Sequence, residues 1–156
     1  MTETDFDALD AQAIALLSNE PDVLACSCNF VALLYKAMDE VNWLGIYVLR
    51  QDELVLGPFQ GKPACIRIPL GRGVCGTAAA ERRSQRVSYV HNFPGHIVCD
   101  EDSRSELVVP LLRGDSLIGV LDIDSPVPGR FTARDQQGVE RLCATFVANI
   151  ARNNFI

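Results

Sequence analysis

The sequence predicts a single α+β domain, in which a mostly antiparallel sheet carries helices from both ends of the chain on one face. Segments with helical periodicity lie at the two ends, and strand-like segments fill the middle. Most of these strands follow one another through short turns, as the strands of antiparallel hairpins do. The 156 residues, 48% of them apolar, are enough for one core and few for two ordinary domains. We therefore expect one domain over residues 1–156.

Helices are expected in both terminal parts of this domain, residues 1–40 and residues 131–156. The first part holds two amphipathic segments, and Ile14 and Leu24 are among the positions expected to be buried. The last part reads as one long helix with Thr132 as its N-cap, because a threonine side chain there can accept a hydrogen bond from a free backbone N–H.

The middle part, residues 41–130, is predicted to hold the sheet and the functional loops. A short helix is expected over 74–83, and the predicted strands cover 42–49, 53–59, 65–68, 86–90, 105–113 and 116–124. Gly114 and Asp115 form a good hairpin turn between the last two strands. Residues 91–105 carry proline, glycine, histidine and acid with little apolar periodicity. A loop of this length in a compact domain is often functional.

Charge and composition exclude several classes of protein. The net charge of −6 disfavours a nucleic-acid binder and attraction to anionic membrane surfaces. The acidic N-terminus lacks a signal-peptide pattern, and no apolar run is long enough to span a bilayer, so a cytoplasmic protein is expected. Thiols stay reduced in the cytoplasm, and the six cysteines include no CxxC pair. We therefore expect free thiols, some of which form catalytic disulfides.

Three cysteines lie in turn-like segments rich in glycine or proline: Cys65, Cys75 and Cys99. Such positions favour thiolate chemistry, whereas a structural cysteine usually lies within an apolar periodic run. This second pattern fits the other three, which we assign to packing: Cys26, Cys28 and Cys143. The placement indicates a thiol enzyme.

The surroundings of the three loop cysteines bear on this interpretation in different ways. Cys65 could instead be a packed residue of the predicted strand over 65–68. Cys75 lies near a helix start, where the helix dipole can lower the pKa of a thiol, but it could instead be a small residue packed behind the turn. Cys99 is followed by three acidic residues, 100–102, whose negative charge opposes thiolate formation.

No metal site is expected from the spacing of potential ligands. His91 and His96 lie near the loop cysteines, but their spacing fits no zinc pattern. The GRGVCG segment, residues 71–76, lacks the lysine and the serine or threonine of a phosphate-binding P-loop.

The order of the elements, with the hairpin VPLLRGDSLIGVLDIDS followed by F-T-x-x-D and a closing helix, resembles a GAF domain. Within that fold the chain is similar to one enzyme family, the free methionine-(R)-sulfoxide reductases. The similarity runs from Asn42 onward and is carried by NWLGIY, LGPFQGKPACIRIPLGRGVCGTA, GHIVCD, SELVVPL and GVLDIDS. The joint presence of Cys65, Cys75 and Cys99 in these contexts is its most specific part.

The resemblance implies the reduction of free methionine sulfoxide, R epimer at sulfur, to methionine. Cys99 matches the attacking thiol, which becomes a sulfenic acid, and Cys65 is the expected resolving thiol. Cys75 is expected to take part in a thiol relay to the external reductant. The pairing of Cys99 with Cys65 or with Cys75 stays open. The resemblance also implies thioredoxin as external reductant, no bound cofactor, and a homodimer formed through the terminal helices.

The substrate site implied by the resemblance includes acids and apolar residues. Glu106 and Asp124 are expected nearest the sulfoxide oxygen, where crowded carboxyl groups can keep a proton to donate. Asp122 is expected to bind the substrate ammonium or to support the other two acids. The alternative is that Asp122 and Asp124, which share one face of a strand, are exposed on a sheet edge. The remaining residues expected to bind the substrate are Trp43, Tyr47, Ile97 and Val98.

Trp43 and Tyr47 are four residues apart on a predicted strand and so share a face, where they are expected to surround the S-methyl group. Without the resemblance, ordinary aromatic residues of a half-buried strand would be the better explanation. Two other functions also compete with the reductase: a GAF sensor that binds a small molecule, and a redox sensor whose disulfide forms without turnover.

Overall fold

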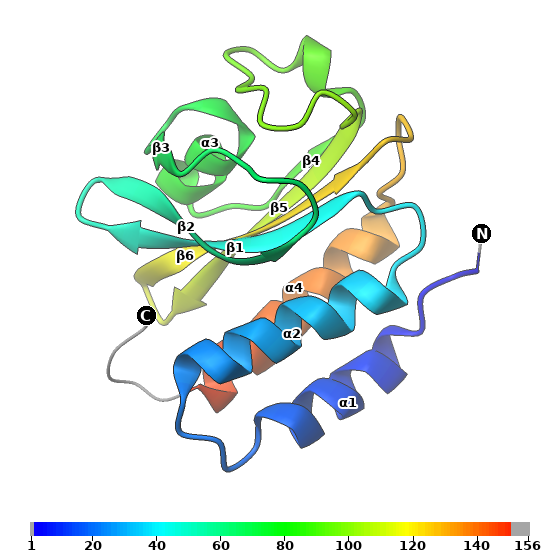
Figure 1. Ribbon diagram of the computed structural model, residues 1–156, viewed down its shortest axis with the longest axis vertical. Helices are drawn as coiled ribbons and strands as arrows, with labels where there is room; N and C mark the ends of the chain where they lie inside the picture. The colour runs from blue at the N-terminus through cyan, green and yellow to red at the C-terminus, as the bar shows by residue number, and fades with distance from the viewer. Residues whose placement is uncertain (1, 151–156) are drawn as a thin grey trace.

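The structure is a computed structural model that describes residues 2–150, and its elements form successive layers (Figure 1). Helix α1 (Phe6–Leu17) packs against α2 (Val23–Ala37) and α4 (Ala133–Asn149), and these two cover one face of the sheet. Helix α3 (Gly73–Glu81) lies on the opposite face. The predicted α+β fold, with helices from both ends of the chain on one face, is confirmed.

The sheet has six strands in the order β3-β2-β1-β6-β5-β4, and each neighbouring pair is antiparallel. The strands are β1 (Trp43–Arg50), β2 (Glu53–Gln60), β3 (Arg67–Pro69), β4 (Gln85–Val87), β5 (Ser105–Arg113) and β6 (Ser116–Ser125). The β5–β6 hairpin returns to the middle of the sheet, where β6 pairs with β1. As a result, β6 has a strand on each side and packed structure on each face.

Side chains on the central strands alternate between two apolar cores. On β6, Leu121 and Ile123 face the core beneath α2 and α4, while Val120 faces the core beneath α3. The same alternation divides β5, where Leu107 and Val109 belong to the helical side. Among residues 2–150 no helix is both long enough and apolar enough to cross a membrane.

The helix ends follow the chemistry that the sequence indicates. Asp5 and Asp22 cap α1 and α2 by accepting hydrogen bonds from backbone N–H groups three residues further on. Thr132 caps α4, as predicted, and exchanges hydrogen bonds with Asp135 in a capping box. The predicted end of this helix, beyond residue 150, lies outside the described residues.

Two predicted strands are shorter in the structure. The strand expected over 65–68 begins at Arg67, because β3 pairs only with Glu53–Val55, and Cys65 lies in the preceding loop. The strand expected over 86–90 ends at Val87 and gives way to a 3-10 turn, since β4 pairs with β5 only as far as Glu106.

Three residues expected to be buried on the helices are exposed. Ile14 and Leu24 point to solvent because their neighbours Ala13 and Val23 occupy the buried positions of the helical repeat. Cys28 is exposed on the outer side of α2, so its assignment to packing is wrong, while Cys26 and Cys143 are buried as expected.

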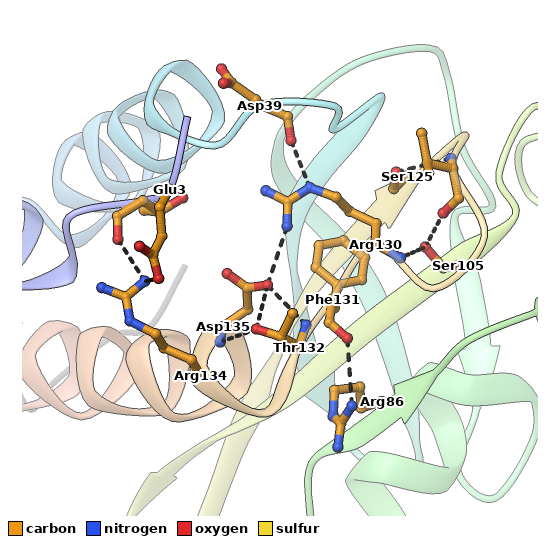
Figure 2. A network of polar contacts seen from close by, with 12 residues as sticks. Glu3, Asp39, Arg86, Ser105, Ser125, Arg130, Phe131, Thr132, Arg134 and Asp135 are labelled. Atoms are coloured by element: carbon orange, nitrogen blue, oxygen red, sulfur yellow. Dashed lines mark hydrogen bonds and ion pairs between the residues drawn. The ribbon is translucent and has the colours of Figure 1, made fainter. Parts of the chain in front are cut away.

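A buried ion pair lies at the start of α4, and a hydrogen bond from its arginine reaches the end of α2 (Figure 2). Arg130 donates hydrogen bonds to the Asp39 carbonyl oxygen at 2.9 Å and to the Asp135 carboxylate at 3.2 Å. The same carboxylate accepts from Thr132, so cap and ion pair share one group. Because both charged side chains are nearly inaccessible to solvent, neither can be removed without leaving a charge unpaired.

The substitution Arg130→Met is expected to lower the free energy of unfolding by about 3–5 kcal/mol, because Asp135 would stay buried without its cation. Urea denaturation of the variant and the wild type measures the difference. Arg141→Ala is the matched control, since Arg141 pairs with Asp7 on the exposed surface and should matter little. Equal losses of unfolding free energy in the two variants would contradict the larger effect expected for Arg130→Met.

Candidate active site

The register of the central strands brings the predicted acids together on one face of the sheet. Asp124 on β6 lies directly opposite Trp43 on β1 and Glu106 on β5. Asp122 lies one row further along, opposite Gly45. These side chains share the face that carries α3, because residues two apart on a strand point the same way. The alternative of exposed aspartates on a sheet edge is wrong, since β6 lies in the middle of the sheet.

A small cavity lies above these acids, between the sheet, α3 and the loop before β5. Its volume open to the centre of a water molecule is about 30 Å³, which is room for only a few waters. Its lining includes all three carboxyl groups and two of the cysteines: Cys75, Cys99, Glu106, Asp122 and Asp124. The fold therefore brings together residues of α3, β5, β6 and the loop before β5.

A disulfide joins Cys65 to Cys99, and Cys99 lines this cavity. The two Cα atoms are 5.4 Å apart, although 34 positions separate the residues in the sequence. Cys75 is a free, buried thiol whose Sγ lies 3.8 Å from Glu106 Oε1. Of the two pairings left open by the sequence, the structure contains Cys65 with Cys99. The alternative that Cys65 is merely a packed strand residue is wrong.

Burial raises the pKa of all three carboxyl groups. Desolvation is the main cause, and mutual repulsion adds to it, so the pKa values of Glu106 and Asp124 rise well above their usual range. The pKa of Asp122 is also raised by burial, although contacts with Glu106 and Cys75 oppose the change. The cluster therefore favours keeping protons near neutral pH, and a protonated carboxyl group can act as an acid.

The Cys75 thiol is not activated, although its position near a helix start predicts a lowered pKa. It is the third residue of α3, but burial and the nearby Asp122 and Glu106 carboxylates raise the pKa of its thiol well above the usual range. The desolvation and repulsion outweigh the helix dipole, so the protonated thiol is favoured.

Trp43 and Tyr47 share a face of β1, as predicted, and their rings form an aromatic wall beside the cavity. The Trp43 ring stacks on Tyr47 at a centroid distance of 5.9 Å and on Phe59 at 5.4 Å. Gly45 lies between them, and a Cβ there would collide with the Trp43 ring. A small recess lies between this wall and Cys99.

The same wall holds the loop that carries Cys65. The Tyr47 hydroxyl donates a hydrogen bond to the Cys65 carbonyl oxygen at 2.8 Å, and Trp43 Nε1 donates to the Lys62 carbonyl oxygen at 3.0 Å. Burial raises the pKa of Tyr47, which keeps its hydroxyl protonated for this bond. Both aromatic residues therefore position a cysteine-bearing loop as well as lining the recess.

The acids that follow Cys99 are partly neutralised by groups that the sequence analysis missed. Lys62 pairs with Asp102, and its Nζ lies 3.9 Å from the Asp100 carboxylate. Asn42 donates a hydrogen bond to Asp100 at 3.1 Å. These contacts tie the Cys99 loop to the Cys65 loop. They also reduce the negative charge beside Cys99 that opposes thiolate formation. The opposite charges of Lys62 and residues 100–102 were the signal that could have revealed the pairing.

The remaining predicted residues lie in or beside the Cys99 loop. Ile97 lines the cavity and packs over Gly73, where a Cβ would come within 3.2 Å of its side chain. His96 also lines the cavity, and burial together with His91 lowers its pKa, which favours the neutral ring. Val98 is 54% exposed and lies outside the cavity lining in this disulfide-closed form.

Folding stability is expected to fall as the pH rises from the ordinary pKa of glutamate to the raised pKa of Glu106 in the folded protein. Over that interval the unfolded chain releases the proton and the folded one retains it, so ionisation favours unfolding. Glu106→Gln removes this ionisable group and should therefore be more stable than the wild type at pH 8, with a smaller difference at pH 5.

Urea denaturation of the disulfide form at both pH values measures this effect, and one unit of pKa corresponds to about 1.4 kcal/mol. Glu40→Gln, at an exposed position, is the control and should show no such change. A Glu106→Gln variant that is less stable than the wild type at pH 8 would show that the carboxylate is well solvated or paired.

Comparison with known proteins places this site in a family. The family model described as "GAF domain" matches residues 7–150. The free methionine-R-sulfoxide reductase of Escherichia coli is 51% identical over 156 residues, covering 99% of this chain and 94% of the relative.

Two similar solved structures lead to the same fold. A structure described as a putative GAF sensor protein from Burkholderia vietnamiensis has a TM-score of 0.91 and 54% identity, covering 93% of this chain and 92% of its own. The structure of fRMsr of Staphylococcus aureus in complex with substrate has a TM-score of 0.92 and 46% identity, covering 97% of this chain and 99% of its own. The chain therefore belongs to the GAF-domain family and, within it, to the free methionine-R-sulfoxide reductases.

Proposed function

We propose that this protein reduces free methionine (R)-sulfoxide to methionine, with Cys99 as the attacking thiol. The observation that carries the proposal is the Cys65–Cys99 disulfide, in which Cys99 lines a cavity together with three carboxyl groups. A disulfide next to such a cavity is the expected product of a reduction performed by two thiols. The proposal is supported by the near full-length similarity to a reductase named for this substrate.

In the first step the Cys99 thiolate attacks the sulfoxide sulfur and the sulfur–oxygen bond breaks. The oxygen passes to Cys99 as a sulfenic acid, and the sulfoxide becomes the thioether of methionine. The departing oxygen needs a proton, which we assign to Glu106 or Asp124, since both line the cavity and burial favours their protonated forms.

In the second step the Cys65 thiol attacks the Cys99 sulfenic acid, which forms the disulfide and releases water. A dithiol protein then reduces the disulfide by thiol–disulfide exchange, and we propose thioredoxin in this role. One sulfoxide and one dithiol are thus converted to one thioether, one disulfide and one water. Cys75 lines the same cavity as Cys99 and is assigned as a second thiol for relay.

The aromatic wall and the third acid are assigned to substrate binding. The recess between Trp43, Tyr47 and Cys99 suits a small S-methyl group, because sulfur makes favourable contacts with aromatic rings. Asp122 is the candidate partner of the substrate ammonium group. Ile97 closes the cavity from the loop side, and Val98 is assigned to binding only in the open form.

The closed form has too little room for the substrate, since the cavity holds only a few waters. We infer that reduction of the disulfide frees the Cys99 loop, and that the loop moves before methionine sulfoxide binds. The contacts of Lys62 and Asn42 with Asp100 hold the loop while they are formed, and the loop is released when they break.

A second candidate function, a GAF sensor, is favoured by the similarity to the structure described as a putative sensor. Binding of a small molecule without turnover would use the same cavity. The predicted homodimer is compatible with either function, and it stays a prediction.

The protein is expected to consume NADPH when supplied with free methionine (R)-sulfoxide, thioredoxin and thioredoxin reductase. Cys99→Ser should reduce this rate by roughly 10³-fold or more, since it removes the nucleophile. Cys28→Ser, at an exposed helical cysteine, should leave the rate unchanged. The S epimer and a peptide-bound sulfoxide test selectivity. A wild-type protein without NADPH consumption would favour the sensor.

Cys65→Ser is expected to separate the two chemical steps. Each protein molecule should still release about one methionine, because Cys99 remains, but the thioredoxin-dependent turnover should fall steeply. A reagent that traps sulfenic acids should then label Cys99 in this variant, as mass spectrometry would detect, and label little in the wild type. Undiminished steady-state turnover in Cys65→Ser, or a Cys99–Cys75 disulfide in its place, would refute Cys65 as the principal resolving thiol.

A further inference from the structure

Three potential metal ligands converge at the floor of the cavity from three different elements. Cys75 lies on α3, Glu106 on β5 and Asp122 on β6, and one ligand atom of each lies within 4.8 Å of the others. All three residues are buried. Because the helix and the strands hold their backbones, the three groups are already close together before any ligand arrives.

The distances between these groups approach those of a coordinated ion. In a tetrahedral zinc site, a thiolate sulfur and a carboxylate oxygen are roughly 3.5 Å apart, given the usual zinc–ligand bond lengths. The Cys75 sulfur lies 3.8 Å from Glu106 Oε1. Small side-chain rotations would bring the third ligand, Asp122, into the same coordination sphere.

Asp122 provides an independent sign that a ligand is missing. Its Oδ1 atom is buried, has no hydrogen-bond partner among residues 2–150, and belongs to a side chain that lines the cavity. The residue is only 6% exposed, so solvent does not solvate this oxygen fully. A buried carboxylate oxygen is costly without a donor or a cation. Either a proton shared with Glu106 or a bound cation would satisfy it.

The donor set selects the class of cation. Magnesium and calcium prefer oxygen ligands throughout, whereas one thiolate with two carboxylates suits a borderline-soft ion such as Zn²⁺. Three protein ligands also leave one position of a tetrahedral zinc ion for water, and the cavity has room for an ion with a water.

We propose that Cys75, Glu106 and Asp122 form a zinc-binding site that is available while the Cys65–Cys99 disulfide closes the cavity. Binding of the ion displaces the thiol proton and any proton held by the Glu106 and Asp122 carboxyl groups, and these protons are released to solvent. If the proposed reductase function holds, zinc and methionine sulfoxide exclude each other, because both would contact the same carboxyl groups. Zinc binding by itself does not depend on that function.

Titration of the metal-free, disulfide-closed protein with Co²⁺ tests the proposal. Co²⁺ replaces zinc in such sites, and a bound thiolate gives it a charge-transfer absorption that carboxylates do not. We expect one Co²⁺ per chain with this absorption, and its displacement by one equivalent of Zn²⁺. Cys75→Ser should abolish the absorption, and Asp122→Asn should weaken Co²⁺ binding by at least about tenfold, as even outer-shell changes do.

Cys28→Ser is the matched control, because Cys28 is an exposed free thiol that could bind metal adventitiously. It should leave the absorption unchanged. An absorption that survives in Cys75→Ser or disappears in Cys28→Ser would overturn the proposal, as would a wild-type protein without thiolate absorption. Circular dichroism checks that the variants are folded, and Asp122→Asn preserves side-chain size. Since Co²⁺ binding needs no turnover, failure of the reductase assay would not imply failure here.

Discussion

The site depends on the alternation of side chains along β6, the strand in the middle of the sheet. Leu121 and Ile123 enter the core beneath the long helices, so Asp122 and Asp124 must point to the opposite face. A slip of one residue in the β6 register would put carboxyl groups into the apolar core and is therefore excluded energetically. The burial of the apolar face thus determines where the acids lie.

Once the register is set, the other groups are positioned by their own anchors. Pairing with β5 places Glu106 opposite Asp124, and α3 lowers Cys75 onto the same carboxyl groups. Gly45 leaves space for the Trp43 ring, which in turn holds the loop carrying Cys65. Each group is buried at a cost, and the raised pKa values of the acids reflect that cost.

The loop that carries Cys99 is held differently from the cavity floor. Its attachments are the disulfide to Cys65, the packing of Ile97 over Gly73, and a few polar contacts, among them the exposed ion pair of Lys62 with Asp102. Exposed ion pairs contribute little to stability, whereas the strands beneath are held by two apolar cores. Reducing the disulfide therefore acts on the least stable part of the site and leaves the acids in place.

The sequence by itself determined the fold class, most helices and strands, and the shared face of Asp122 and Asp124. It also singled out Cys65, Cys75 and Cys99 as candidate reactive thiols. Local periodicity and turn chemistry carry that information. Tertiary structure alone decided the ends of the short strands, the exposure of Cys28, and the contacts of Lys62. It also reversed the expected pKa shift of Cys75, because burial beside acids from distant segments outweighs a helix dipole. Such effects depend on neighbours that only folding brings together.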